Sequence, residues 1–157
     1  MYSSIDSGGQ THVKYAHFYF PRKIEVLCSN CSRPSTLTNI DAPIEIEFFI
    51  DIAPYKHEWN FNCNHCLKRK LVDWDSVKKF ELLNKINIRN ETIWAWNTNH
   101  LDYLVGVFSN SENKNHEWTF YRNYIKKNWF QKIKNKSDRK KLLDLLLTNI
   151  DLFKTQP

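Results

Sequence analysis

The sequence predicts an α+β protein in which an antiparallel β module comes first and a basic helical part of three to four helices follows. Three observations support this fold class. Apolar residues alternate with polar ones before residue 74, whereas after it they recur every three or four residues. All four cysteines lie in the first part, and the excess of positive charge lies in the second. We therefore divide the chain into a tail at 1–12, a β module at 13–74 and a helical domain at 75–157.

Composition and the amino-terminal stretch limit the classes to which the protein can belong. The chain has 157 residues, 15% of them aromatic and only three glycine, which is the composition of a packed globular protein. No stretch approaches the ~18 apolar residues of a membrane span. The start, MYSSIDSGGQTHVKY, lacks the basic and apolar regions of a secretory signal. We expect a cytoplasmic protein without membrane contact.

Strands are expected before each cysteine pair. The segment AHFYFPRKIEVLC at 16–28 is rich in aromatic and β-branched residues and leads into the first pair as one or two strands. IEIEFFIDI at 44–52 alternates as a half-buried strand does. HEWNFNC at 57–63 leads into the second pair and places Trp59 and Phe61 on one face.

The cysteines form two identical C-x-x-C units, Cys28 with Cys31 and Cys63 with Cys66. Each unit lets two thiolates approach one ion from a single tight turn, and tetrahedral Cys₄ coordination satisfies Zn²⁺ completely. We therefore predict one structural zinc ion in a site without an open position for catalysis. The 31 residues between the units exceed the usual 15–20, so an insertion or longer strands must fill the gap.

Three other interpretations of the cysteines stay open. Structural disulfides require an oxidising compartment, for which the sequence shows no export signal. A redox pair requires one C-x-x-C at a helix start within a βαβ pattern, and ferredoxin-type iron–sulfur clusters use other spacings. His57 and His65 lie near the second unit, but four sulfurs leave neither histidine necessary as a ligand.

The order of strands and cysteine pairs resembles the zinc-ribbon group over residues 13–74. The resemblance implies an antiparallel ribbon and a connection with nucleic-acid machinery, because that group includes modules of transcription factors, ribosomal proteins, primases and topoisomerases. Ser32 and Leu67 depart from the commonest pattern of the group, in which a glycine often follows each cysteine pair.

Four stretches after residue 74 have the apolar spacing of helices. They are one behind a cap at Asp75 or Ser76, one at 101–108, one at 117–133, and one behind a cap at Ser137 that runs to Phe153. The last has an apolar stripe with a widened flank. The stripe consists of Leu142, Leu146, Ile150 and Phe153, and the flank of Leu143 and Leu147.

Two further segments carry a second resemblance. WAWNTNHLDYL at 94–104 and WFQKIKNKSDRKKLLDLL at 129–146 are together similar to a pattern of small uncharacterised bacterial proteins. Those proteins combine an amino-terminal Cys₄ ribbon with a helical remainder. The resemblance implies this architecture and a bacterial or phage origin, and it implies no activity.

The net charge of +6 is divided unevenly, with −2 over 1–66 and +8 over 67–157. Excess positive charge favours a polyanionic partner, because neutralised phosphates release condensed counterions, although it also serves solubility. On one straight helix from 117 to 134 the charges would not share a face. The candidate contacts to DNA or RNA are Lys68, Arg69, Lys70, Arg122, Lys126, Lys127, Lys132, Lys134, Lys136, Arg139, Lys140 and Lys141.

Aromatic residues are interleaved with these charges and are able to stack on unpaired bases. They are Trp94, Trp96, Trp118, Tyr121, Tyr124 and Trp129. Most have helical spacing, which favours a place in the core, whereas Trp96 lies off the stripe and is the best candidate for an exposed ring. Neither His100 with Asp102 nor His116 with Glu117 forms a recognisable catalytic signature, so we expect no enzyme activity.

Two hypotheses of function follow from these patterns. The first is a zinc-binding accessory protein that engages nucleic acid through its basic helical part, in one version beside a larger bacterial or phage effector protein. The second is an adaptor or inhibitor that docks a partner protein through the ribbon edge or the helical surface. The sequence contains neither a base-reading motif nor a heptad seam that would separate them.

Overall fold

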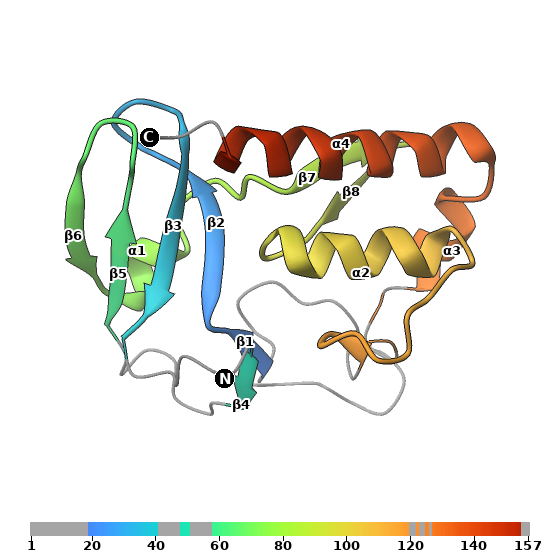
Figure 1. Ribbon diagram of the computed structural model, residues 1–157, viewed down its shortest axis with the longest axis horizontal. Helices are drawn as coiled ribbons and strands as arrows, with labels where there is room; N and C mark the ends of the chain where they lie inside the picture. The colour runs from blue at the N-terminus through green and yellow to red at the C-terminus, as the bar shows by residue number, and fades with distance from the viewer. Residues whose placement is uncertain are drawn as a thin grey trace.

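The structure is a computed structural model that describes residues 19–40, 48–50, 58–119, 122, 125 and 127–154. A four-stranded antiparallel sheet that carries the cysteines is followed along the chain by a short helix, a two-stranded hairpin and three further helices (Figure 1). The predicted α+β class is confirmed. The predicted tail at 1–12 lies outside the described residues, and the boundary at residue 74 stays a prediction.

The strands of the main sheet follow the order β2-β3-β5-β6. Their bounds are β2 Lys23–Leu27, β3 Pro34–Asn39, β5 Trp59–Asn62 and β6 Arg69–Val72. The register places Ile24, Leu37 and Phe61 in one row across three strands, and all three side chains are buried. Trp59 shares this core face with Phe61, as predicted. Lys70 lies opposite Phe61 and therefore on the same face.

The two edges of this sheet differ. Beside β2, the segment 81–83 continues the hydrogen bonding, because Leu27 N donates to Glu81 O at 2.9 Å and Leu83 N donates to Glu25 O at 3.1 Å. On the outer side of β6, no further strand of the described residues pairs with it. The sheet is therefore closed at β2 and open at β6.

The strand predicted at 44–52 lies mostly outside the described residues. Its described part, β4 Phe48–Ile50, pairs with β1 Tyr19–Pro21 in a small separate sheet. The connection between the cysteine pairs thus leaves the main sheet after β3 and returns as β5, which accounts for its unusual length.

The first predicted helix is much shorter than its pattern indicated. Helix α1 spans Trp74–Val77, and its cap is Asp73, whose side chain accepts a hydrogen bond from Ser76 N at 2.9 Å. Neither Asp75 nor Ser76 is the cap, because both already lie within the first turn. The prediction of a cap at these residues was therefore wrong by two to three positions.

The stretch after α1 forms a β-hairpin instead of continuing the helix. Strands β7 Lys85–Ile88 and β8 Glu91–Trp94 pair in antiparallel register. Arg89 and Asn90 connect them with φ values of 52° and 67°, which is the backbone of a type I′ turn. This turn matches the twist of the two strands and sets their register.

Helix α2, Thr98–Phe108, buries the apolar stripe predicted at 101–108. The helix predicted at 117–133 is helical at its end, where α3 spans Lys127–Lys132. Residues 117 and 118 lie in a turn and residue 119 has 3₁₀ geometry, so the prediction of an α-helix was wrong for this part. Here the His116 ring accepts a hydrogen bond from Trp118 N at 3.1 Å, a local side-chain bond that competes with helix formation.

Helix α4, Lys136–Lys154, packs against α2 and differs from its prediction in two respects. Its first turn is capped by Asn135, which accepts a hydrogen bond from Asp138 N at 2.9 Å, and not by Ser137. Leu143 and Leu147 do not widen the buried stripe, because they are 41% and 52% exposed. Of the helices in the described part of the chain, none combines the length and apolar composition needed to cross a membrane.

The core runs without interruption from the sheet into the helices and includes four fully buried tryptophans, Trp59, Trp96, Trp118 and Trp129. The expectation of an exposed Trp96 was therefore wrong. This residue precedes α2, so helical spacing does not describe its direction. Its ring packs edge-on against Trp94 at 4.9 Å between centroids.

A buried carboxylate connects the sheet to the helical part. Glu25 on β2 is 2% exposed and accepts hydrogen bonds from Thr98 N at 2.6 Å and from Asn84 Nδ2 at 2.9 Å. Asn84 in turn accepts from Asn149 Nδ2 of α4 at 2.8 Å. Thr98 begins α2, where a backbone N–H lacks a partner within the helix and negative charge is favourable.

Candidate metal centre

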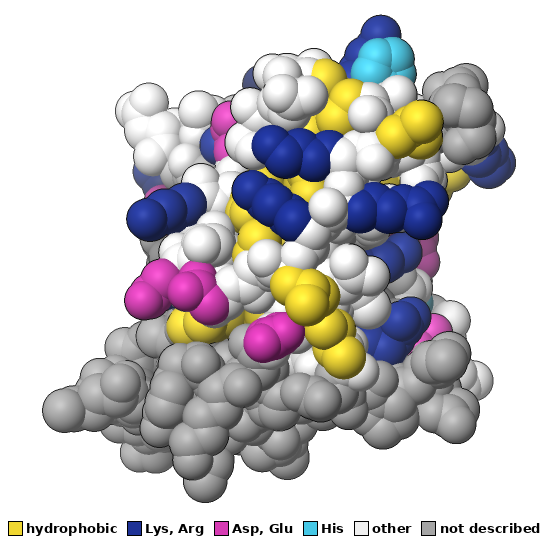
Figure 2. Space-filling view, turned by 90° about the vertical axis from the view of Figure 1, so that its left-hand side faces the viewer, with side chains coloured by type: hydrophobic (Ala, Val, Ile, Leu, Met, Phe, Trp, Pro, Cys, Tyr) yellow, Lys and Arg dark blue, Asp and Glu magenta, His cyan; other side chains and the backbone are white. Residues whose placement is uncertain are grey.

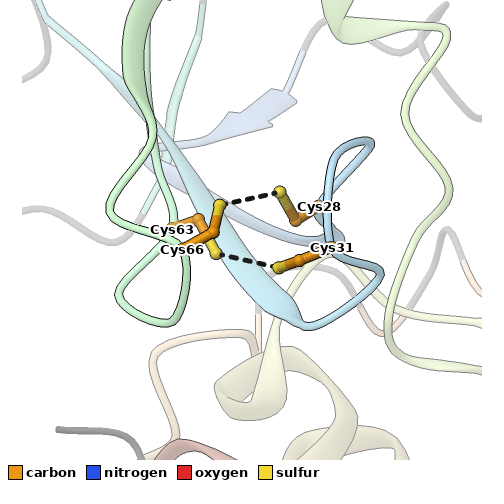
Figure 3. Close-up of side chains that lie close together, drawn as sticks. All are labelled: Cys28, Cys31, Cys63 and Cys66. Carbon is orange, nitrogen blue, oxygen red and sulfur yellow. Dashed lines mark hydrogen bonds between the residues drawn. The ribbon is translucent and has the colours of Figure 1, made fainter.

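Both cysteine pairs lie at the same end of the sheet. Strands β2 and β5 run parallel to each other, since each is antiparallel to β3 between them. The turn with Cys28 and Cys31 follows β2, and the turn with Cys63 and Cys66 follows β5. Figure 3 shows the four side chains pointing toward one another from these two turns.

The four sulfurs have the spacing of a metal site. All Sγ atoms lie within 4.8 Å of one another, with 3.8 Å between Cys28 and Cys66 and 3.6 Å between Cys31 and Cys63. A regular tetrahedron with Zn–S bonds of 2.3 Å has edges of about 3.8 Å. The four cysteines are free thiols, and their arrangement fits one tetrahedral ion.

The two turns have the same backbone geometry. Ser32 and Leu67, each directly after a cysteine pair, both have φ of 64°, in the left-handed region that favours glycine. Cys28 N donates to the carbonyl of Arg33 at 2.8 Å, and Cys63 N donates to that of Lys68 at 3.0 Å, so each turn closes in the same way. The turn that usually contains glycine therefore forms here without it.

Hydrogen-bond donors around the site favour thiolates at the second pair. Burial acts to raise the pKa of Cys63, but hydrogen bonds from the Ser35 hydroxyl and from neighbouring backbone N–H groups outweigh it and lower the pKa to about 6. The backbone N–H of Lys68 lowers the pKa of Cys66. Burial raises the pKa of Cys31 to about 11, so a metal must displace the proton of that thiol.

Within the described residues, the group able to hold a metal consists of these four cysteines without a histidine. His65 lies inside the second turn with its side chain exposed to solvent. His57 is outside the described residues. A closed Cys₄ site leaves no position for a reacting water, and it retains net negative charge because four thiolates exceed the charge of Zn²⁺.

The predicted nucleic-acid contacts form two separate groups. Lys68, Arg69 and Lys70 are exposed at the second cysteine turn and on the open edge strand β6. The others that the structure describes belong to the region of α3 and the first turns of α4, at the end of the molecule far from the sheet (Figure 1). The structure therefore does not bring the two basic groups together.

Several residues of the second group are engaged within the protein. Arg122 lies 3.6 Å from a carboxylate oxygen of Glu112, Arg139 donates to Lys134 O at 2.7 Å, and Lys140 pairs with Asp144 at 2.8 Å. Lys132 is half-buried, and Lys126 is outside the described residues. Within this second group, the exposed lysines that form no ion pair with a described residue are Lys127, Lys134, Lys136 and Lys141.

Beside the first cysteine turn lies a cavity of about 430 Å³ that the sequence did not predict. Its walls include Lys70 of β6, Lys79 just after α1, and the ring of Phe80. These residues come together only because α1 folds over the core face of the sheet, and no spacing in the sequence reports that contact. Lys and Arg side chains gather on the adjoining face, with apolar side chains between them (Figure 2).

Comparison of the chain with models of protein families, with curated proteins and with solved structures finds no match in any of the three.

Proposed function

We propose that this protein binds one structural Zn²⁺ through Cys28, Cys31, Cys63 and Cys66 and has no enzymatic activity of its own. The observation that supports zinc is the tetrahedral spacing of four free thiols on two identical turns. Soft thiolate ligands select zinc or iron–sulfur chemistry over magnesium or calcium. The site acts by fixing both turns and the strands that lead into them.

The test of the zinc site is elemental analysis of the purified protein. We expect about one zinc per chain, and Cys63→Ser should lose the metal together with the fold of the sheet. Structural zinc contributes ~10–16 kcal/mol of apparent binding free energy in small peptides, which matches the whole stability of a domain. His65→Ala is the control and should keep its zinc. Iron in place of zinc, or unchanged melting of the metal-free protein, would contradict the assignment.

We further propose that the basic side chains bind nucleic acid. Support comes from the start of α4, where Lys136, Lys140 and Lys141 lie in the first turns of a long helix. The helix dipole disfavours a cation in the first turn by ~0.3–1 kcal/mol, so Lys136 does not stabilise the helix, and Lys141 has no ion pair among the described residues. A phosphate backbone is a ligand that would compensate for them.

A salt titration tests this part of the proposal. Binding to duplex and single-stranded DNA and to RNA should weaken steeply as salt rises, because each neutralised phosphate contributes about 0.9 to the log–log slope on duplex DNA. Absence of binding to all three at low salt would contradict the nucleic-acid proposal and would not affect the proposal of a zinc site.

The alternative is a protein adaptor, and exposed leucines favour it. Leu67 and Leu71 are 71% and 59% exposed beside or on the open edge strand, where another chain could add a strand. Leu143 and Leu147 are exposed on α4. In this alternative the lysines keep the edge from aggregating. A partner protein that is retained at high salt would favour the adaptor.

A further inference from the structure

The cavity beside the first cysteine turn combines positive charge, hydroxyl groups and an aromatic ring. Lys70 and Lys79 supply the charge, and both side chains are exposed. Ser29, Ser32 and Ser76 supply hydroxyls that are able to donate or accept hydrogen bonds. The volume of about 430 Å³ lies within the range of small-molecule sites, roughly 300–1,000 Å³.

Positive charge in this cavity lies on the side of Lys70 and Lys79, whereas the metal centre behind Cys28 and the carboxylate of Asp73, which interacts electrostatically with Lys79, are negative. Glu81 is the acidic residue of the lining, and its carboxylate already pairs with Lys85 at 2.8 Å. Asp75, in the preceding helix, pairs with Lys78 at 3.2 Å. Neither lysine of the cavity takes part in an ion pair among the described residues. The lysine side of the cavity therefore suits an anion.

The aromatic ring of the cavity is held firmly. Phe80 is half-buried, and its ring stacks on the buried Phe61 with 5.0 Å between centroids and 21° between planes. Lys70 stands opposite Phe61 in the register of β5 and β6, so its side chain starts from the same face of the sheet. The apolar Leu27 also borders the cavity. A flat apolar group and a phosphate would thus find complementary surfaces side by side.

We propose that this cavity binds one unpaired nucleotide of a single-stranded nucleic acid. Its base stacks against Phe80 and Leu27, and Lys70 and Lys79 hold the phosphate. Cys28 in the wall places the negative metal centre nearby, so the phosphate must lie on the lysine side. A base within a duplex is already stacked and paired, so the cavity distinguishes single strands from duplexes. This inference rests on the proposed nucleic-acid binding and narrows its ligand to unpaired strands.

The test measures the affinity of the full-length, zinc-loaded protein for a labelled oligothymidylate and for a duplex of equal length. Phe80→Leu should weaken single-strand binding roughly 5- to 150-fold, the range found for removal of one stacking aromatic residue. Duplex binding should change less than about twofold. Phe80→Tyr should bind single strands with about the affinity of the wild type, because tyrosine keeps the aromatic ring. Lys79→Gln should reduce the single-strand salt slope by about 0.7, whereas Lys114→Gln, at an exposed lysine outside the proposed contacts, should leave single-strand binding unchanged.

Zinc content and melting temperature of each variant show whether it is folded. A second measurement needs no variant: thymidine monophosphate titrated into the wild-type protein should shift the backbone amide NMR signals of Ser29, Ser32 and Ser76. Shifts confined to residues 134–141 would overturn the inference.

The outcomes separate this inference from the broader proposal. If Phe80→Leu binds single strands as tightly as wild type does, the cavity is not a nucleotide site, but nucleic-acid binding stands. If neither strand form binds at low salt, both proposals fail. Binding of a phosphoserine peptide that Lys79→Gln abolishes, without binding of oligothymidylate, would overturn the inference in favour of a protein ligand.

Discussion

At the scale of single residues, several non-glycine residues have a left-handed backbone conformation in which glycine would cause less strain. Ser32 and Leu67 adopt left-handed backbone in the cysteine turns, and Arg89 and Asn90 adopt it in the hairpin. Arg89 has a compensating contact, since its Nε lies 3.0 Å from the buried carboxylate of Asp138. Leu67 has none of this kind, because its side chain is 71% exposed.

Replacing Leu67 with glycine should therefore stabilise the zinc-loaded protein. Glycine adopts positive φ without the ~1–2 kcal/mol penalty of a side chain, but it gives part of this back through greater freedom in the unfolded chain. We expect the free energy of unfolding in urea to rise by up to ~1 kcal/mol. Leu67→Ala, which keeps a Cβ, should show no such gain. A loss of stability in Leu67→Gly would show that the leucine side chain contributes to the fold.

A buried histidine gives stability a specific pH dependence. Burial lowers the pKa of His100 from 6.5 to about 3, and its Nδ1 accepts a hydrogen bond from Trp96 N at 3.2 Å. The unfolded chain takes up a proton below pH 6.5, while the folded protein does not until about pH 3. The contribution is therefore fully present above pH 6.5 and is lost as the pH falls.

We expect the free energy of unfolding to fall by up to ~1.4 kcal/mol per pH unit between pH 6.5 and 5 because of His100. The measurement compares wild type with His100→Gln in urea at excess zinc, so that protonation of the thiols affects both proteins alike. The variant should be less stable at pH 7 and should show a shallower slope. Equal slopes would mean that His100 is protonated in the folded protein as well.

At the scale of elements, α2 could be predicted because its apolar spacing matches a helix over 11 residues, and β5 because Trp59 and Phe61 alternate with polar residues directly before a cysteine pair. The hairpin β7–β8 could not, since its strands have four residues each and its turn, Arg89 with Asn90, lacks the glycine that usually marks a type I′ turn. The cysteine cluster could be predicted from spacing alone. The cavity depends on contacts between distant segments, which spacing does not report.

The Glu25 network shows how these elements depend on one another. Glu25→Ala should leave Asn84 Nδ2 and Thr98 N without their buried acceptor and lower the free energy of unfolding by about 2–4 kcal/mol. The matched control is Lys23→Gln, whose ammonium group lies 3.6 Å from the same carboxylate but is partly exposed. Lys23→Gln should lower the free energy of unfolding by less than ~1 kcal/mol. Similar effects of both variants in urea unfolding would contradict a central role for the buried hydrogen bonds.

At the scale of the whole molecule, the two basic groups lie at opposite ends, so charge and stability can be separated by experiment. Replacing Lys134, Lys136, Lys140 and Lys141 with Gln should leave the free energy of unfolding within about 0.5 kcal/mol per residue, since these side chains are exposed. The salt slope on duplex DNA should shrink by up to about 3.6 if all four touch phosphates.

The matched variant replaces Lys68, Arg69 and Lys70 with Gln at the other end of the molecule. Comparing its salt slope with that of the four-Gln variant shows which end carries the contacts. Trp129→Ala serves as the control for packing. Loss of the buried ring should lower the free energy of unfolding by ~3–5 kcal/mol and should reduce binding only through unfolding. If both charge variants bind with the wild-type slope, the lysines are solvated surface and the adaptor becomes the better proposal.

The closure of the β2 edge by later residues has a consequence for synthesis on the ribosome. At ~5–20 residues per second, Thr98 leaves the ribosome roughly 2–6 s after Cys66. Both cysteine turns are complete during this interval, while β2 has an unpaired edge and Glu25 lacks the partners that later bury it. Zinc captured by the nascent chain would hold the strands in register until the hairpin and α2 arrive. Supply of the metal during translation, and not only afterwards, would then determine how much of the protein reaches its folded state.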